Sequence, residues 1–98
     1  MEYISKKVKS NIVLDEYQIN LLSDFYKNNF AMVARTMIKK NNIVANCMDN
    51  HDLFFLRVSK NDIIEITVMS DSRDLCEKVG IILEKYFAGM FVLDDDLD

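Results

Sequence analysis

The stretch LFFLRVSKNDIIEITVM, residues Leu53–Met69, decides the fold that this sequence predicts. It contains two apolar runs on either side of Ser59–Asp62, and an amphipathic segment follows it. Pairing Val58 with Ile64 sets apolar residues opposite one another along one whole face. That register leaves Lys60–Asp62 as a three-residue loop, where asparagine or aspartate adopts the left-handed conformation at low cost. The stretch therefore predicts a β-hairpin that leads into a helix.

Helical segments are predicted before this hairpin. Asp15 fits the N-cap of a helix whose apolar face runs to Tyr26. The next segment, Phe30–Ile38, follows helical spacing more closely than strand alternation, and one unbroken helix over Asp15–Lys40 is an alternative to two. Two segments stay open, because Met1–Leu14 and Ile43–Met48 each fit either a helix or a strand. The expected order is thus helices, hairpin and a final helix.

The final helix begins near Asp71 or Ser72 and carries a wide apolar stripe that continues past Gly89. A core of this size cannot easily cover such a stripe, so a homodimer is predicted to use the excess. The predicted dimer interface consists of Leu75, Val79, Ile82, Leu83, Tyr86, Phe87, Met90 and Phe91.

Length and composition indicate one globular domain, residues 1–93, followed by an acidic tail, residues 94–98. The net charge is −4, from 16 acidic and 12 basic residues in 98, and four aspartates of the tail account for it. The balanced body argues against nucleic-acid binding through bulk charge. No apolar run is long enough for a membrane span, no secretory signal is visible, and two isolated cysteines favour a cytoplasmic protein.

Residues Val33–Met48 resemble a helix-turn-helix, with the small residue Ala34 where two helices cross and with Val44 and Met48 four apart to hold the second helix. The order of elements resembles the winged-helix superfamily, which includes small bacterial repressors and the centromere-binding adaptors of plasmid segregation. That resemblance implies an α+β, helix-rich domain with one β-hairpin and a long C-terminal dimerisation helix. It implies a small dimeric DNA-binding protein, a transcription regulator or partition adaptor, that inserts a recognition helix into the major groove.

The resemblance also implies which residues contact double-stranded DNA. Exposed asparagines are expected to reach base edges, because an amide can pair with adenine. Basic residues are expected to contact phosphates, with one at the tip of the wing. The base-contacting set is Asn41, Asn42, Asn46 and Asn50, the phosphate-contacting set is Arg35, Lys39 and Lys40, and the wing residue is Lys60.

An alternative follows if Phe30–Ile38 and Ile43–Met48 are strands. The chain is then an α-β-β-β-β-α antiparallel meander and a non-enzymatic protein-interaction module. In support, Asp52–Val58 is similar to a mid-sheet strand of roadblock-type dynein light chains and GTPase regulators. The apolar hairpin favours this alternative, and the spacing of Phe30–Ile38 favours the first.

Catalytic and metal chemistry find little support in the sequence. The single histidine, His51, has no nucleophile in a matching context, and no glycine-rich loop could hold a phosphate. Cys47, Asp49 and Asp52 lie near His51, but a metal site usually needs a second Cys or His pair. The protein is therefore expected to be no enzyme and to hold no metal or other cofactor.

Overall fold

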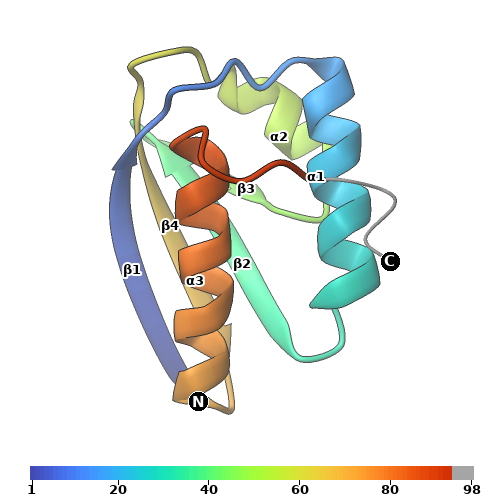
Figure 1. Cartoon of the computed structure of the whole chain (residues 1–98), viewed down its shortest axis with the longest axis vertical. Coiled ribbons are helices and arrows are strands. Elements are labelled where there is room, and N and C mark those ends of the chain that lie inside the picture. Colours follow the sequence, from blue (N-terminus) through green and yellow to red (C-terminus); the bar gives the residue numbers. More distant parts are fainter. Residues whose placement is uncertain (94–98) are drawn as a thin grey trace.

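A computed structural model describes residues 1–93, in which four strands and three helices form one α+β unit (Figure 1). The elements are β1 (Glu2–Lys9), α1 (Glu16–Asn29), β2 (Ala34–Lys40), β3 (Ile43–Asn46), α2 (Asn50–Leu56), β4 (Ile63–Ser70) and α3 (Arg73–Phe87). The predicted acidic tail, residues 94–98, lies outside the described residues.

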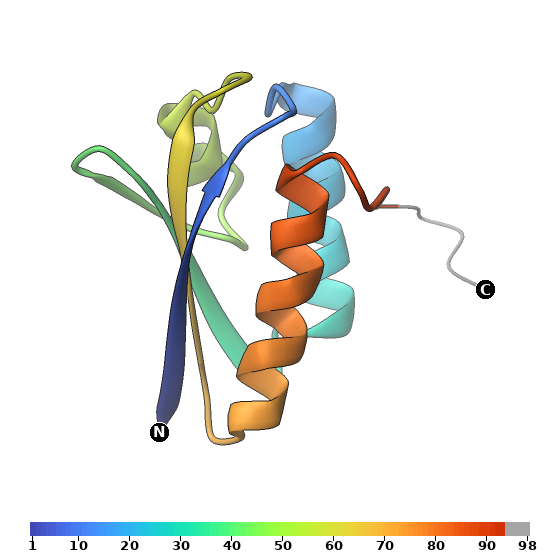
Figure 2. The ribbon, with the colours of Figure 1, turned by 60° about the vertical axis from the view of Figure 1, so that its left-hand side comes forward.

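The four strands form one antiparallel sheet in the order β1-β4-β2-β3. The last strand in sequence therefore lies between the first two. Helices α1 and α3 cover one face of the sheet, and no helix of residues 1–93 covers the opposite face, which we call the bare face (Figure 2). The register sets Val8 beside Ile64 and Ile38 beside Ile66, all four of them buried under the helices. Alternate residues of each strand consequently point to solvent.

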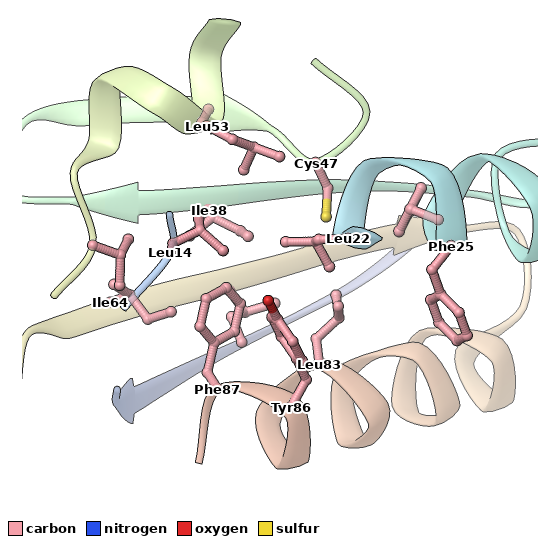
Figure 3. Close-up of a cluster of buried hydrophobic side chains, with 14 of the residues drawn as sticks. Leu14, Leu22, Phe25, Ile38, Cys47, Leu53, Ile64, Leu83, Tyr86 and Phe87 are labelled. Atoms are coloured by element: carbon pink, nitrogen blue, oxygen red, sulfur yellow. The ribbon is translucent and has the colours of Figure 1, made fainter. Parts of the chain in front are cut away.

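The core lies between the sheet and the two long helices (Figure 3). Its largest fully buried side chains are Tyr26, Phe87, Leu22, Ile38, Leu53, Leu56, Ile64, Ile66, Leu83, Val58, Val68 and Val79. The hydroxyl group of Tyr26 lies 2.7 Å from the hydroxyl oxygen of Thr36, so the two buried polar groups satisfy each other. Apolar burial from every element thus holds a single layer of helices on a single sheet.

The predicted hairpin in Leu53–Met69 is wrong in its first half. Only the second half is a strand, β4, whereas Leu53–Leu56 form the last turn of helix α2. Leu53 and Leu56 are three residues apart and both fully buried, which is helical rather than strand spacing. The loop before β4 does contain a left-handed asparagine, because Asn61 has a φ of 76°.

The helix predicted over Phe30–Ile38 is also wrong. Residues Ala34–Lys40 form strand β2, which pairs with β3 on one side and β4 on the other. The first strand occupies Glu2–Lys9, where the sequence left the choice open. The predicted cap at Asp15 is confirmed, since its carboxylate accepts the backbone N–H of Gln18.

These elements exclude the winged-helix architecture. No second helix follows Phe30–Ile38 in the way a helix-turn-helix requires, and β4 pairs with β1 and β2 rather than within a local hairpin. The alternative is nearer, because the sheet is four-stranded and antiparallel, but its strand order is not that of a meander.

The apolar stripe of α3 packs largely into the core of the same chain. Four residues of the predicted dimer interface, Val79, Leu83, Tyr86 and Phe87, belong to the core. They are unavailable to a second copy without unfolding, and Leu75, Ile82 and Phe91 are half-buried while Met90 is exposed. No helix within residues 1–93 has the length and apolar character that crossing a bilayer needs.

Candidate functional site

Helix α2 presents two adjacent phenylalanines to solvent. Its inward positions are taken by Leu53 and Leu56, and the two residues between them therefore point outward. Phe54 is 51% exposed and Phe55 is 59% exposed, with ring centroids 5.9 Å apart and ring planes at 76°. The guanidinium carbon of Arg57 lies 5.4 Å from the centroid of the Phe54 ring, within range of a cation–π contact. Large exposed side chains that lie together mark a binding surface more often than single ones do.

A groove of about 420 Å³ runs between these rings and the first turns of α1. Its lining consists of Glu16, Ile19, Asn20, Asn50, His51, Phe54 and Phe55, a set that we call the α1–α2 surface. The amide of Asn50 donates to the side-chain oxygen of Asn20 at 2.7 Å and so joins the two helices across the groove. The surface is therefore built on two helices rather than on a loop.

Capping interactions hold α2 in position. The carboxylate of Asp49 accepts the backbone N–H of Asp52 at 3.1 Å and caps the helix. Asp52 in turn accepts the backbone N–H of Asn46 at 3.2 Å, which ties the helix to the end of β3. At the other end Arg57 adopts φ of 51° and ends the helix in the left-handed conformation. A helix of only seven residues is fixed in this way at both ends.

A second groove, of about 640 Å³, borders the other side of the start of α1. Exposed apolar side chains, Val13, Tyr17 and Val92, lie along it. The hydroxyl group of Tyr86 donates to the side-chain oxygen of Gln18 at 2.9 Å beneath it. Burial raises the pKa of Tyr86, so this hydroxyl stays protonated and available as a donor. The first two turns of α1 thus separate two apolar grooves.

The residues predicted to contact DNA do not form one surface. Arg35 and Lys39 are on strand β2, Asn41 and Asn42 are in the turn that follows it, and Lys60 precedes β4. They are spread over the sheet and its loops rather than along a recognition helix.

Several of these residues have structural roles instead. Lys40 lies 2.8 Å from the carboxylate of Asp62 and donates to the backbone oxygen of Arg57 at 2.7 Å. Asn41 has φ of 55° and makes the turn between β2 and β3. The amide oxygen of Asn46 accepts the backbone N–H of Met48 at 2.9 Å, and Asn50 joins α2 to α1 as described above. These side chains therefore form turns or connect neighbouring elements of the fold.

The residues considered as a metal site in the sequence do not come together as ligands in the described structure. Both cysteines are unpaired, Cys47 is fully buried, and burial raises the pKa of its thiol to about 12. His51 is exposed on α2 and lines the groove. Within residues 1–93 no three His, Cys, Asp or Glu side chains gather closely enough to hold a metal ion.

Solved structures with the same fold are known. The crystal structure of the phosphocarrier protein HPr from Bacillus anthracis str. Ames matches with a TM-score of 0.71, covering 89% of this chain and 99% of that one at 16% identity. HPr-C-His from Thermoanaerobacter tengcongensis matches with a TM-score of 0.65, covering 94% of this chain and 100% of that one, also at 16% identity. No protein-family model and no curated protein matches the sequence.

The class of protein that this fold defines is an HPr-like α+β domain, and at 16% identity the likeness shows the fold alone. It overturns the winged-helix resemblance, and with it the predictions of double-stranded DNA as partner, of transcription regulation and of plasmid partition. It also overturns the roadblock resemblance of Asp52–Val58, since that segment is mostly helix α2.

Sequence reasoning missed Phe54 and Phe55 as surface residues. Four consecutive apolar residues looked like a buried strand, although a short apolar run cannot be assigned by periodicity alone. One signal was present: Asp49 followed three residues later by Asp52 resembles a helix-capping pattern. A helix that starts there turns Leu53 and Leu56 to one side and the phenylalanines to the other.

Proposed function

We propose that this protein is a non-enzymatic binding module that recognises another protein through the α1–α2 surface. The observation that carries the proposal is the pair Phe54 and Phe55, exposed side by side on a helix that is fixed at both ends. Aromatic anchors on rigid elements lose little conformational entropy when they bind, and such residues dominate protein–protein affinity. A half-exposed phenylalanine also leaves apolar area in water that a partner can cover.

The groove chemistry favours a partner with apolar and basic groups. Glu16 lines the groove and Asp15 caps the same helix, whereas no lysine or arginine is found among the described residues that line it. A phosphoryl group carries negative charge and is held by basic side chains or helix N-termini. The first turn of α1 does border the groove, but Asp15 and Glu16 place negative charge there. The lining thus supports binding of a protein rather than the phosphocarrier role named for the similar structures. We also propose a cytoplasmic location, which the unpaired Cys47 and Cys76 favour.

Site-specific photocrosslinking tests the proposal. A benzoylphenylalanine placed at Phe55 is expected to give a discrete protein adduct in an extract of the source cells, because its ring lies at the surface. The same probe at Ile81, an exposed apolar residue of α3, is the matched control and is expected to give none. Changing Phe54→Ser in the Phe55 probe variant should remove the adduct, since both anchors are needed.

An equal adduct pattern from both probe positions would show that the contacts are unspecific and would contradict the proposal. Folding of each variant is checked by circular dichroism. The substitutions themselves are at exposed positions, so the free energy of unfolding should change by less than about 0.5 kcal/mol.

A further inference from the structure

The outer edge of the sheet is an eight-residue strand with unused backbone groups. Strand β1 lies at the margin of the sheet, and among residues 1–93 it pairs only with β4 (Figure 1). The backbone N–H of Ser10 donates to the oxygen of Asp62 at 2.8 Å, on the β4 side. The register is unbroken back to Glu2, and residues two apart on a strand direct their backbone groups the same way. The even-numbered residues of β1 therefore bond to β4.

The odd-numbered residues direct their N–H and C=O groups away from the sheet. These are Tyr3, Ser5, Lys7 and Lys9, and all four residues are exposed. Their backbone groups make no hydrogen bond with any described part of the chain beyond the β1–β4 ladder, whose bonds belong to the even positions. A row of eight free backbone groups is a template for one more strand.

The side chains of the same residues lie on the bare face of the sheet, because alternate residues share a face. That face is basic. Lys7 and Lys39 flank Glu65 across the sheet, in the register Lys7–Glu65–Lys39, and a shallow hollow of about 250 Å³ lies between them. Lys9 and Arg35 extend the positive charge along the face, where Glu65 is the one acidic side chain of the three paired strands β1, β4 and β2.

Residues 1–93 are balanced in charge, because four aspartates of the tail account for the net charge of −4, so a basic face leaves an acidic excess on the rest of the domain. Lysines along a free edge normally protect it, because two copies of the strand would bring like charges together. The same lysines attract an extended segment whose acidic side chains lie opposite them. The charge of this edge thus favours an acidic partner strand over a second copy of β1.

We infer that β1 binds an acidic, extended segment of a partner protein as a fifth strand. Backbone hydrogen bonds from Tyr3, Ser5, Lys7 and Lys9 supply the pairing. Carboxylates of the partner, at every second position, lie on the bare face beside Lys7 and Lys9. This site is separate from the α1–α2 surface and does not depend on the function proposed for it.

A synthetic peptide tests the inference on the full chain. The probe is an acetylated, amidated eight-residue peptide of alternating aspartate and valine, and its matched control has lysine for aspartate. Binding is followed by amide NMR spectra and hydrogen exchange. The exchange of the Ser5 and Lys7 amides is expected to slow by about tenfold or more with the acidic peptide, because each amide gains a partner. The lysine peptide should leave both unchanged.

Two pairs of variants separate backbone pairing from charge. Ser5→Pro removes only an outward N–H, whereas Ser5→Ala keeps it, and both lose the hydroxyl contact with Thr67. The proline variant should bind the acidic peptide about tenfold more weakly than the alanine variant. Lys7→Glu with Lys9→Glu should weaken binding by about tenfold, whereas Lys27→Glu with Lys78→Glu, the same charge change on the helices, should have less than about twofold effect.

Three results would overturn the inference. One is equal binding of the acidic and lysine peptides. Another is chemical-shift change over the bare face without slower exchange of the β1 amides, which would mean charge attraction without strand pairing. The third is concentration-dependent dimerisation that protects the same amides with no peptide present, which would assign the edge to a second copy. Phe55→Ser should leave peptide binding unchanged, so failure here is distinct from failure of the α1–α2 surface.

Discussion

A single carboxylate, Asp62, links the end of β2 to the loop before β4. It lies 2.8 Å from the ammonium group of Lys40 and accepts the backbone N–H of Ser59 at 2.7 Å. The hydrogen bond from Lys40, with that from Ser59, lowers the pKa of Asp62 below its ordinary value of 3.8. A carboxyl group with a lowered pKa stabilises the folded state above its ordinary pKa, and this contribution disappears as the pH falls through the lowered value.

Asp62→Asn is therefore expected to lower the free energy of unfolding at pH 7, and the difference from the unchanged protein should shrink as the pH falls below the ordinary carboxyl pKa of 3.8. Urea unfolding at a series of pH values measures this. Asp24→Asn, which removes one negative charge at an exposed position of α1, serves as the control for the change in net charge. A difference for Asp62→Asn that does not shrink as the pH falls below 3.8 would contradict the ion-pair explanation.

Gly89 ends α3 with a φ of 79°, a conformation that other residues adopt at a cost. A Cβ atom there would lie 3.6 Å from the Cβ of Asn11, so space is available and only the backbone opposes substitution. Gly89→Ala should lower the free energy of unfolding by about 1–2 kcal/mol, measured by urea titration. Gly89→Asn should cost less, because asparagine tolerates this conformation better. A neutral alanine variant would disprove the left-handed assignment.

At the scale of elements, α1 is joined to β2 by one buried contact between hydroxyl groups. Tyr26 and Thr36 are both fully buried, and burial raises the pKa of Tyr26 to about 12, so its hydroxyl stays protonated. Tyr26→Phe leaves Thr36 without that partner and should cost about 1–3 kcal/mol of unfolding free energy. Adding Thr36→Val should recover most of the loss, since neither polar group then remains. Additive losses in this double-mutant cycle would show that the pair does not interact.

The same contact explains why the sequence of β2 predicts a helix instead of a strand. A strand covered on one face should alternate apolar and polar residues. Here Thr36 can be buried because its hydroxyl group forms a hydrogen bond with that of Tyr26, while Met37 points to the bare face. The alternation is thereby reversed at two neighbouring positions, and helical spacing fits the apolar residues better. No property of the segment alone reveals a hydrogen bond to Tyr26, ten residues earlier.

Helix α2 was missed for a related reason. Phe54 and Phe55 made Leu53–Leu56 uniformly apolar, and this resembled a buried strand. Exposed aromatic residues break the rule that apolar side chains are inside, and departures from such rules gather at functional sites. The error therefore falls on the surface that we propose for binding. By contrast, α1 and α3 were predictable, because Asp15 and Ser72 cap them and their apolar stripes lie on the core.

For the whole molecule, the sequence supports the α+β class and the existence of one core, but not the arrangement of the strands. Pairing of β1 with β4 joins residues about sixty positions apart, such as Val8 and Ile64, and no local pattern encodes it. The basic face could not be predicted from the sequence for the same reason. Lys7 on β1 and Lys39 on β2 are distant in the sequence and come to flank Glu65 only through this strand order.

That strand order also determines when each strand can pair during synthesis of the chain. Because β4 lies between β1 and β2, neither of those strands can find this neighbour until synthesis has passed residue 70. Before β4 is synthesised, the local structures available to the emerging chain are α1, the β2–β3 pair and α2, while β1 lacks its partner strand β4. Because β1, β4 and β2 pair over long stretches of sequence, the complete sheet can form only after most of the chain is available.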